Sequence, residues 1–465
     1  MKLIIGNSYT YLEGASSSEV NAVWDALSFQ VPNYHIIKRK KNIPHWNGMS
    51  SMLDKRNRRF LTGLLPDVCK HLVDFHVGYE VEDRRKKPKA SFEEIELDGI
   101  ELYDYQMAAV ETFVQHGRGV LDIAPSGGKT EIAIATSQHL NLKTLFLVNR
   151  VGLMEQSAKR FAKRWPDCSN SIGLLGGGEY DPRQITFATV QTINSALKSA
   201  PDEIAEFLRS IEFIIIDEAH NASSATFCKA INLCENAYYR MCLSGTPFMK
   251  ANPEANMTLQ GIAGNRLVKI SNDFLIRDGA TAKPYFKFIP TKCEKLKSDM
   301  EWMDVYEQGV VHNEHRNRLI SLVTQKLIDQ GKRPLVLVER IKHGENLMRE
   351  LQSIGIRCDF VYGQDDQYRR NQIIRQFQKG QLDVLLANTI FDEGISVDEI
   401  TALVNAGAGK SSIKIFQRIG RVMRLNEDDD EAFIVDFFDS HHPMLINQSK
   451  GRYEVVSQED GFILV

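Results

Sequence analysis

The 465-residue sequence predicts an α/β protein with two parallel-sheet domains in tandem, preceded by a small α+β domain. Short β-branched runs alternate with helical stretches along residues 96–275, and the same alternation returns along residues 276–465. Such alternation is typical of parallel sheets with helices on both faces. Residues 1–95 lack it and carry short apolar clusters broken by Asn, Gly and Pro, which predict a separate small domain.

Ten short apolar runs are the candidate strands of the two parallel sheets. In the first domain they are residues 119–123, 144–148, 185–188, 213–216 and 240–243. In the second domain they are residues 334–338, 358–362, 384–387, 402–405 and 432–436. The basic, proline-containing stretch of residues 84–89 has no apolar periodicity, so we expect a linker there and a domain boundary near residue 95.

Composition excludes several classes of protein. Hydrophobic residues make up 43% of the chain and charged residues 25%, a balance typical of globular proteins rather than disordered or fibrous ones. No apolar run approaches the roughly 20 residues that span a bilayer, and the first residues are too polar for a signal peptide. Seven scattered cysteines without a CxxC pair exclude a disulfide scaffold and a cysteine-based zinc site. We therefore expect a cytoplasmic protein without a membrane partner.

The net charge of −3 hides an asymmetry. Residues 31–90 hold 14 Lys and Arg against 6 Asp and Glu, whereas the rest of the chain holds 43 against 54. Such segregation favours a basic face that binds a polyanion. The candidate contacts are Lys38, Arg39, Lys40, Lys41, Trp46, Arg56, Arg58 and Arg59. For the Lys and Arg residues, the alternative is a solvated basic face without a ligand. For Trp46, the favoured interpretation is a place in the core of the small domain.

The most informative segment is GVLDIAPSGGKTEIAIAT, in which a strand leads through a glycine-containing loop into a helix. The N–H groups of such a loop, with the helix N-terminus behind them, bind phosphate oxygens. The candidate contacts are Ser126, Gly127, Gly128, Lys129 and Thr130. Lys129 would reach the β- and γ-phosphates of ATP, and the Thr130 hydroxyl would bind Mg²⁺. Because Ile123 stands where the usual spacing has its first glycine, a helix-starting turn is the alternative.

A second motif follows the apolar run 214–216, which ends in Asp217 and Glu218. The carboxyl end of a parallel strand is where open α/β sheets bind ligands. Asp217 would hold Mg²⁺ beside the phosphate loop, and Glu218 would orient the attacking water or accept its proton. An exposed acidic turn is the alternative, but the two motifs together predict a nucleoside triphosphatase.

An ordered series of segments along residues 100–430 resembles the superfamily 2 helicases. The segments are LYDYQMAA, APSGGKT, VNRVGLMEQ, FATVQTI, DEAH, SGTP, LVLVERIKHGENL, LLANTIFDEGISV and QRIGRVMR. The resemblance implies two RecA-like domains, residues 96–275 and 276–465, that hydrolyse ATP with Mg²⁺ and bind a nucleic acid. It assigns adenine recognition to Gln106.

The resemblance also implies a contribution from the second RecA-like domain. Arg421 and Arg424, three residues apart, would project from one helix face and neutralise charge on the transferred phosphoryl group. Gln417 would face the nucleotide or the interdomain cleft, and Gly394 would lie at the same cleft. A solvated basic helix end is the alternative for the arginines. By their positions in the motifs, the candidate contacts to the tracking strand are Arg150, Gln191 and Thr389.

More narrowly, the chain is similar to phage branch-migration helicases of the UvsW type and, more distantly, to RecG. This similarity includes Trp46-Asn47-Gly48 and the domain junction FLIRDGATAKPYF. It implies a monomeric enzyme that remodels branched DNA, such as forks or Holliday junctions, with residues 1–95 as a duplex-binding domain. A duplex translocase without strand separation, an RNA helicase and an ATP-gated junction-binding protein are the alternatives.

Overall fold

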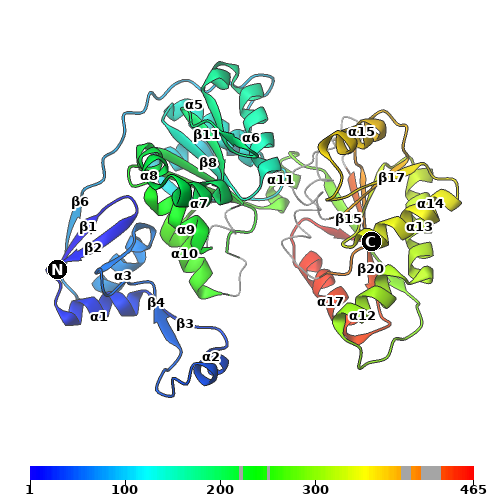
Figure 1. The fold of residues 1–465 in the computed structure, drawn as a ribbon, viewed down its shortest axis with the longest axis horizontal. Coiled ribbons are helices and arrows are strands. Elements are labelled where there is room, and N and C mark those ends of the chain that lie inside the picture. Colours follow the sequence, from blue (N-terminus) through cyan, green and yellow to red (C-terminus); the bar gives the residue numbers. More distant parts are fainter. Residues whose placement is uncertain (219–223, 249–251, 389–398, 410–430) are drawn as a thin grey trace. The chain divides into compact units, whose positions relative to one another are not determined.

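The computed structural model describes residues 1–218, 224–248, 252–388, 399–409 and 431–465 (Figure 1). The chain divides into two compact units. The first comprises Met1–Ile123 and Gly128–Lys269, and the second comprises Ala124–Gly127 and Ile270–Val465. Among the helices in these described ranges, none is long and apolar enough to cross a membrane.

The N-terminal part of the first unit contains two small sheets. The larger sheet has the order β5-β2-β1-β6, formed by β1 (Lys2–Ile5), β2 (Tyr9–Glu13), β5 (Arg59–Leu61) and β6 (Glu80–Asp83). The smaller sheet pairs β3 (Ser28–Gln30) with β4 (Met49–Ser51). The helices are α1 (Ser17–Ala26), α2 (Tyr34–Lys40), the short η1 (Thr62–Leu64) and α3 (Leu65–Asp74). This mixture of helices and mostly antiparallel strands agrees with the predicted α+β fold.

The hydrophobic spacing of the helices explains how this part packs. Val68 and Leu72, four residues apart and therefore on one face of α3, are fully buried in one cluster with Val23 of α1 and Leu12 of β2. Residues 84–103, which follow β6, contain no helix or strand, as the linker prediction requires for residues 84–89.

The rest of the first unit is an eight-stranded sheet with helices packed around it. Its order is β10-β9-β11-β8-β12-β13-β7-β14. The strands are β7 (Arg118–Ile123), β8 (Thr144–Val148), β9 (Ile172–Gly176), β10 (Glu179–Tyr180), β11 (Ile185–Thr189), β12 (Phe213–Asp217), β13 (Tyr239–Ser244) and β14 (Arg266–Ile270). The helices are α4 (Asp104–His116), α5 (Lys129–Leu140), α6 (Val151–Arg164), α7 (Val190–Ser199), α8 (Pro201–Ser210), α9 (Ala225–Leu233), α10 (Pro253–Ala263) and the short η2 (Pro166–Ser171).

The larger of the two small sheets and the eight-stranded sheet share one hydrophobic core. The guanidinium of Arg240, at the start of β13, donates to the hydroxyl of Ser8 at 2.8 Å, and that of Arg118 donates to the carbonyl of Asn7 at 3.1 Å. A Cβ on Gly63 of η1 would lie 2.1 Å from the carbonyl oxygen of Gln260 in α10, so only glycine permits this approach. The N-terminal part is therefore fixed to the first large sheet.

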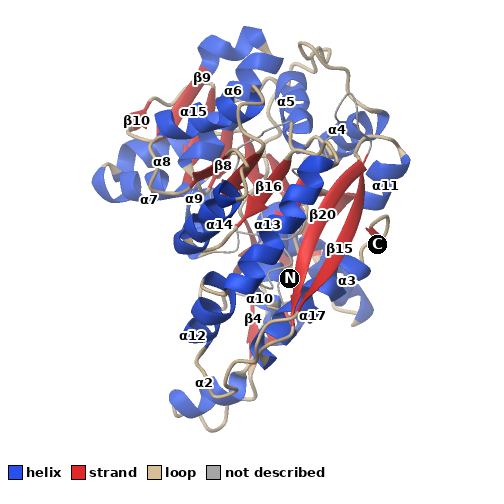
Figure 2. Cartoon of the chain, turned by 90° about the vertical axis from the view of Figure 1, so that its right-hand side faces the viewer, coloured by secondary structure: helices blue, strands red, loops and turns tan. Residues whose placement is uncertain are grey.

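The second unit contains a seven-stranded sheet of order β17-β18-β16-β19-β20-β15-β21. The strands are β15 (Lys283–Thr291), β16 (Pro334–Leu337), β17 (Cys358–Val361), β18 (Val384–Ala387), β19 (Ala402–Asn405), β20 (Glu431–Asp439) and β21 (Ile463–Leu464). The helices are α11 (Asn272–Arg277), α12 (Trp302–Tyr306), η4 (Glu307–Val311), α13 (Glu314–Asp329), α14 (Ile341–Ser353), α15 (Gln367–Gln378) and α17 (Pro443–Ser457). Figure 2 shows β15 and β20 side by side, and their residues pair in parallel along their whole length.

All ten predicted strands are present in the described structure, and the fold class is confirmed. β8, β18 and β19 begin and end at the predicted residues, and every one of their side chains is buried. A strand covered on both faces gives a continuous apolar run, which is the signal the sequence offers. β9, β14 and β15 are additional strands, partly exposed and therefore without such a run.

Candidate functional site

The candidate nucleotide site lies at the carboxyl ends of three neighbouring strands, β7, β13 and β12. The strands are parallel, with Ser244 opposite Asp122 and Leu243 opposite Asp217. This register brings the loop after β7, the Ser-Gly-Thr turn after β13 and the acidic pair after β12 to one edge of the sheet. Ligands of open α/β sheets bind at this edge.

The loop between β7 and α5 has the backbone of a phosphate cradle. Ser126 and Gly128 adopt positive φ angles of 66° and 77°, and Gly127 N–H donates to the carbonyl of Ala124 at 3.2 Å. Gly128 is the N-cap of α5 and gives it no side-chain cap, and the N-terminus of a helix is where backbone N–H groups bind anions. The Nζ of Lys129 donates to the carbonyl of Ile123 at 3.1 Å and therefore lies across the loop.

The acidic pair ends β12 with a strained backbone. Asp217 is half-buried, and its Oδ1 accepts a hydrogen bond from the N–H of Glu218 at 2.9 Å. Glu218 has a φ of 51°, a left-handed conformation that is uncommon for a residue with a Cβ. Such strain concentrates at functional sites, where the surrounding structure holds a side chain in the orientation that its function requires.

Gln106, the proposed adenine reader, packs against the phosphate loop. Its side chain is 5% exposed, and its Oε1 accepts from the N–H of Tyr103 at 3.1 Å. Its Nε2 donates to the hydroxyl of Tyr105 at 3.4 Å. A Cβ on Gly128 would lie 2.0 Å from that Nε2, so glycine is required where the two meet. The structure thus brings the glutamine and the phosphate loop together.

These residues fit a nucleoside triphosphate with Mg²⁺. The loop contains a glycine at residue 128, where a Cβ would collide with the Gln106 amide. The Thr130 hydroxyl, on the first turn of α5, makes no hydrogen bond to any described residue, which leaves it available as a metal ligand. An oxygen pair formed by a hydroxyl and a carboxylate, Thr130 and Asp217, matches the preference of Mg²⁺ for a few protein oxygens.

The other half of the same sheet edge carries two candidate contacts to nucleic acid. Thr189 at the end of β11 pairs with Val148 at the end of β8. Gln191 and Arg150 each follow two residues later, and both side chains are exposed. The sheet order thus separates the nucleotide candidates on β7, β13 and β12 from these candidates on β8 and β11.

Residues 31–48, which connect β3 to β4, form a projection that we call the arm. Lys38, Arg39, Lys40 and Lys41 lie at the end of α2 and just after it, and their side chains make no ion pair with any described residue. Trp46 is half-buried and packs edge-on against Tyr34, with ring centroids 6.2 Å apart, and its Nε1 donates to the carbonyl of Met49. It therefore packs within the arm and is not among the residues of the hydrophobic core cluster, where the sequence analysis favoured placing it.

The three arginines of the β4–β5 turn differ in their surroundings. Arg56 is exposed and makes no hydrogen bond to a described residue, and Arg58 is exposed with one hydrogen bond to the carbonyl of Ala15. Arg59 instead pairs with Asp54, and its guanidinium lies 4.1 Å from the ring centroid of Tyr9. Arg59 is thus engaged within the domain, and of the three it is the least available to a ligand.

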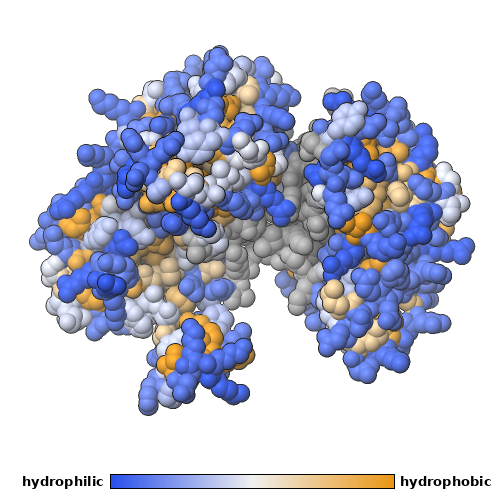
Figure 3. All heavy atoms as spheres, viewed as in Figure 1, coloured by the Kyte–Doolittle hydropathy of each residue, from blue (hydrophilic) through white to orange (hydrophobic). Residues whose placement is uncertain are grey.

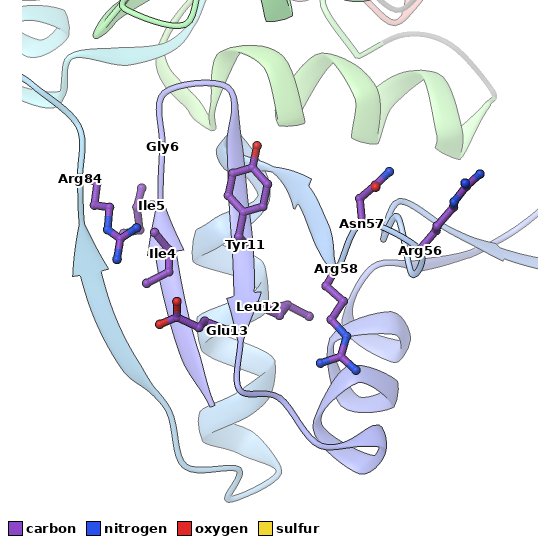
Figure 4. A pocket seen from close by; sticks show the side chains of 10 residues that line it. All are labelled: Ile4, Ile5, Gly6, Tyr11, Leu12, Glu13, Arg56, Asn57, Arg58 and Arg84. Atoms are coloured by element: carbon purple, nitrogen blue, oxygen red, sulfur yellow. The ribbon is translucent and has the colours of Figure 1, made fainter.

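A pocket of about 540 Å³ lies beside this turn (Figure 4). Figure 4 shows Tyr11 on β2 between Arg84 on one side and Arg56 and Arg58 on the other. The remaining lining residues are Ile4, Ile5, Gly6, Leu12, Glu13 and Asn57. Arg84 pairs with Glu82, so Arg56 and Arg58 supply the basic charge of the rim, and the ring of Tyr11 is 42% exposed. The pocket therefore suits a phosphate-bearing chain.

Several predicted site residues lie outside the described residues. They are Thr389, Gly394, Gln417, Arg421 and Arg424. The sequence analysis in turn missed Tyr11, Arg84 and Tyr105. Tyr11 belongs to a strand in which buried and exposed side chains alternate, a pattern that does not indicate a ligand. Arg84 lies in a stretch that the sequence analysis interpreted as a linker. Only the pairing of β1 with both β2 and β6 brings Tyr11 and Arg84 to one pocket.

Comparison with known proteins defines the class. The family described as "Type III restriction enzyme, res subunit" matches residues 99–249, and the "Helicase conserved C-terminal domain" matches residues 314–426. Together these ranges cover more than half of the chain. The chain belongs to the superfamily 2 helicases. Enzymes of this family use ATP.

Several relatives of known name are similar to the chain over most of its length. It is 25% identical over 403 residues to "Putative helicase 22" of Sulfolobus islandicus filamentous virus, covering 80% of this chain and 70% of that protein. It is 23% identical over 447 residues to "ATP-dependent DNA helicase uvsW" of Enterobacteria phage T4, covering 90% and 86%. A fragment of a putative HsdR subunit of a type I restriction enzyme from Vibrio vulnificus YJ016 has the same fold, with a TM-score of 0.60, 17% identity, and coverage of 86% and 73%.

Proposed function

We propose that this chain is an ATP-dependent DNA helicase or translocase that remodels branched DNA, such as forks and Holliday junctions. One observation carries the proposal. The basic N-terminal surface belongs to one unit with β7, Gly128 and Lys129, whereas Ala124–Gly127 of the loop are grouped with the second unit. The Arg240–Ser8 and Arg118–Asn7 hydrogen bonds join that surface to the first large sheet. A surface that grips duplex DNA therefore moves together with the domain that binds the nucleotide.

In the proposed ATP site, each group has a distinct task. Lys129 and the loop N–H groups hold the phosphates, and Thr130 with Asp217 holds Mg²⁺. Glu218 orients the attacking water and accepts its proton. Gln106 recognises the adenine. Arg421 and Arg424, supplied by the second RecA-like domain with Gln417 and Gly394 nearby, neutralise charge on the phosphoryl group once the domains close.

The proposed DNA contacts form two groups. Arg150 and Gln191, with Thr389, bind the backbone of the tracking strand, so movement is independent of base identity. The basic arm and the rim of the Tyr11 pocket bind duplex backbone through Lys and Arg, which gives affinity without sequence readout. The name of the phage T4 relative supports DNA as the substrate. A monomer suffices for this scheme.

DNA-stimulated ATP hydrolysis tests the proposal. The full chain is assayed with single-stranded, duplex, forked and four-way DNA, with RNA of the same sequence as a control. We expect forked and four-way DNA to stimulate most and RNA to stimulate least. Stimulation by RNA alone would identify an RNA helicase. Equal stimulation by plain duplex, with displacement of a triplex strand but not of a fork strand, would identify a duplex translocase.

The variant Lys129→Ala separates an enzyme from a junction-binding protein. We expect it to lose ATP hydrolysis by about two orders of magnitude or more while DNA binding is retained, because the lysine contacts only the phosphates. Lys198→Ala, at an exposed position on α7, is the matched control. Turnover that persists in Lys129→Ala would contradict the assignment of the phosphate loop.

A further inference from the structure

We propose that Arg160 sets the ATP affinity of this chain by neutralising the carboxylate of Glu131 beside the phosphate loop. Arg160 is thus a positioning residue, which acts on the nucleotide only through Glu131. This inference rests on the proposed function, because it concerns the same nucleotide site. It is argued from the place of Glu131 in its helix, from the charge that ATP brings and from the partner of the carboxylate.

An acidic side chain stands in the helix turn that is proposed to bind phosphate. Glu131 directly follows Lys129 and Thr130 in the first turn of α5, and it is 7% exposed. Helical side chains lean toward the helix N-terminus, so its carboxylate lies over the start of α5. Its Oε2 is 3.7 Å from the position of a Cβ on Gly128. The proposed ATP site gives this carboxylate no task of its own.

Such a carboxylate has opposite effects on the empty and the occupied site. A negative charge near a helix N-terminus is favourable, so Glu131 stabilises α5 while no nucleotide is bound. The triphosphate of ATP brings several further negative charges to the same turn. Like charges repel strongly in a partly buried site, because water and salt screen them little there. Tight binding of ATP therefore requires a cation that compensates Glu131.

Arg160 of α6 supplies that cation. Its Nε donates to Oε1 of Glu131, and its Nη2 forms an ion pair with the same oxygen. No other described cation forms an ion pair with Glu131. The two residues are 29 positions apart, so they meet only because α5 and α6 pack against each other.

A purely structural link between the two helices is the alternative. Every residue of α5 from Glu131 to Gln138 is buried, so the helix is already held by its packing. The side chain of Arg160 is 39% exposed, and a partly exposed ion pair adds little to stability. The pair therefore matters more for the charge of the phosphate-binding turn than for the packing of the helices.

The test measures the dissociation constant of a fluorescent ATP analogue with Mg²⁺, and KM and kcat of DNA-stimulated ATP hydrolysis, in the full chain. Arg160→Met leaves the carboxylate uncompensated. We expect the dissociation constant and KM each to rise about fivefold or more, while kcat stays within about twofold of the wild type. Arg160→Lys keeps the positive charge and should bind within about twofold of the wild type. Thermal melting of each variant checks that the fold is retained.

Two further variants show whether charge is the cause. Glu131→Gln/Arg160→Met removes both charges and should return the dissociation constant to within about twofold of the wild type. Lys159→Met removes a positive charge from the next position of α6, where the side chain is exposed and has no ion pair with a described residue. Figure 3 shows mainly hydrophilic surface at the upper edge of the first unit, where Figure 1 places α5 and α6. Because this surface charge does not face Glu131, the Lys159→Met control should bind the analogue normally.

Each outcome decides. Equal dissociation constants for the wild type and Arg160→Met overturn the inference and leave the proposed function intact. A loss of affinity that the double variant does not recover also overturns it, because Arg160 would then act through packing. An equal loss in Lys159→Met would show that the total charge of α6 is what matters, and overturns it as well. A wild type that does not bind the ATP analogue contradicts the proposed function, and this inference with it.

Discussion

The guanidinium of Arg240 donates to the hydroxyl of Ser8 at 2.8 Å, across 232 positions of the sequence. Arg240 is 1% exposed, and it also donates to the carbonyls of Cys234 and Ala237. Burial lowers the pKa of Arg240 to about 10, so the side chain stays charged at neutral pH. Burying a cation costs free energy even when neutral acceptors hold it. The hydrogen bonds of Arg240 fix the N-terminal domain to the sheet.

Arg240→Met should destabilise the first unit. It removes the side-chain donor of the Ala237 carbonyl, while the Cys234 carbonyl keeps the N–H of Ala237 and the Ser8 hydroxyl keeps its bond to Asn232. We expect a loss of about 1–3 kcal/mol in the free energy of unfolding. Urea unfolding measures it. Arg209→Met, at an exposed arginine, is the control and should change stability by less than about 0.5 kcal/mol. An unchanged Arg240→Met variant would show that the hydrophobic core alone joins the two parts.

Gly128→Ala should impair nucleotide binding. The new Cβ would collide with the amide of Gln106, at a φ of 77° that alanine disfavours. We expect nucleotide affinity to fall about tenfold or more, measured by titration with a fluorescent ATP analogue. Gly152→Ala, in helix α6 with no atom near its Cβ, is the control and should bind normally. Equal affinities in both variants would place the nucleotide elsewhere.

Arg56→Gln and Arg59→Gln should fail in different ways. Arg56 has no partner among the described residues, so its loss should weaken duplex binding and reduce the slope of log K against log salt by about one. Arg59 pairs with Asp54 and lies over Tyr9, so its loss should chiefly lower the melting temperature. Duplex binding measured across a salt series, together with the melting temperature of each variant, distinguishes the two effects. The reverse pattern would move the DNA surface to the Arg59 side.

The second unit should lose stability in mild acid because of His343. This imidazole is fully buried, and its burial, followed by Arg316 and His312, holds its pKa well below the usual value. Asn317 Nδ2 donates to the carbonyl of Val311, so its Oδ1 accepts from His343 Nε2 at 3.0 Å, which places the proton on Nε2.

The sign of the pH dependence follows. Below about pH 6.5 the unfolded chain binds a proton that folded His343 does not, so unfolding becomes easier as pH falls, by up to about 1.4 kcal/mol per pH unit. Above that pH the contribution is constant. Urea unfolding between pH 7.5 and 5 measures it. His343→Gln keeps a donor for Asn317 and should show a shallower slope. Equal slopes would contradict a neutral buried imidazole.

Much of the fold could be predicted because its signals are local. The run Thr144–Val148 is fully buried, so it gives continuous hydrophobicity over the length of a strand. β15 could not be predicted, because its side chains vary from buried to exposed and its neighbours, β20 and β21, lie far along the chain. The phosphate loop was visible for the same local reason, since strand, loop and helix are contiguous.

The sequence by itself determined the class of protein and the parallel sheets. It also predicted residues for a nucleotide site, because phosphate and Mg²⁺ chemistry requires fixed residue types at fixed spacings. The tertiary structure alone decided which basic side chains are available. Arg56 and Arg59 are three residues apart in one cationic turn, yet only Arg59 faces Asp54 and Tyr9. It also decided that the N-terminal domain is fixed to the first sheet, because Arg240 and Ser8 meet only after strands distant in the sequence have paired and packed.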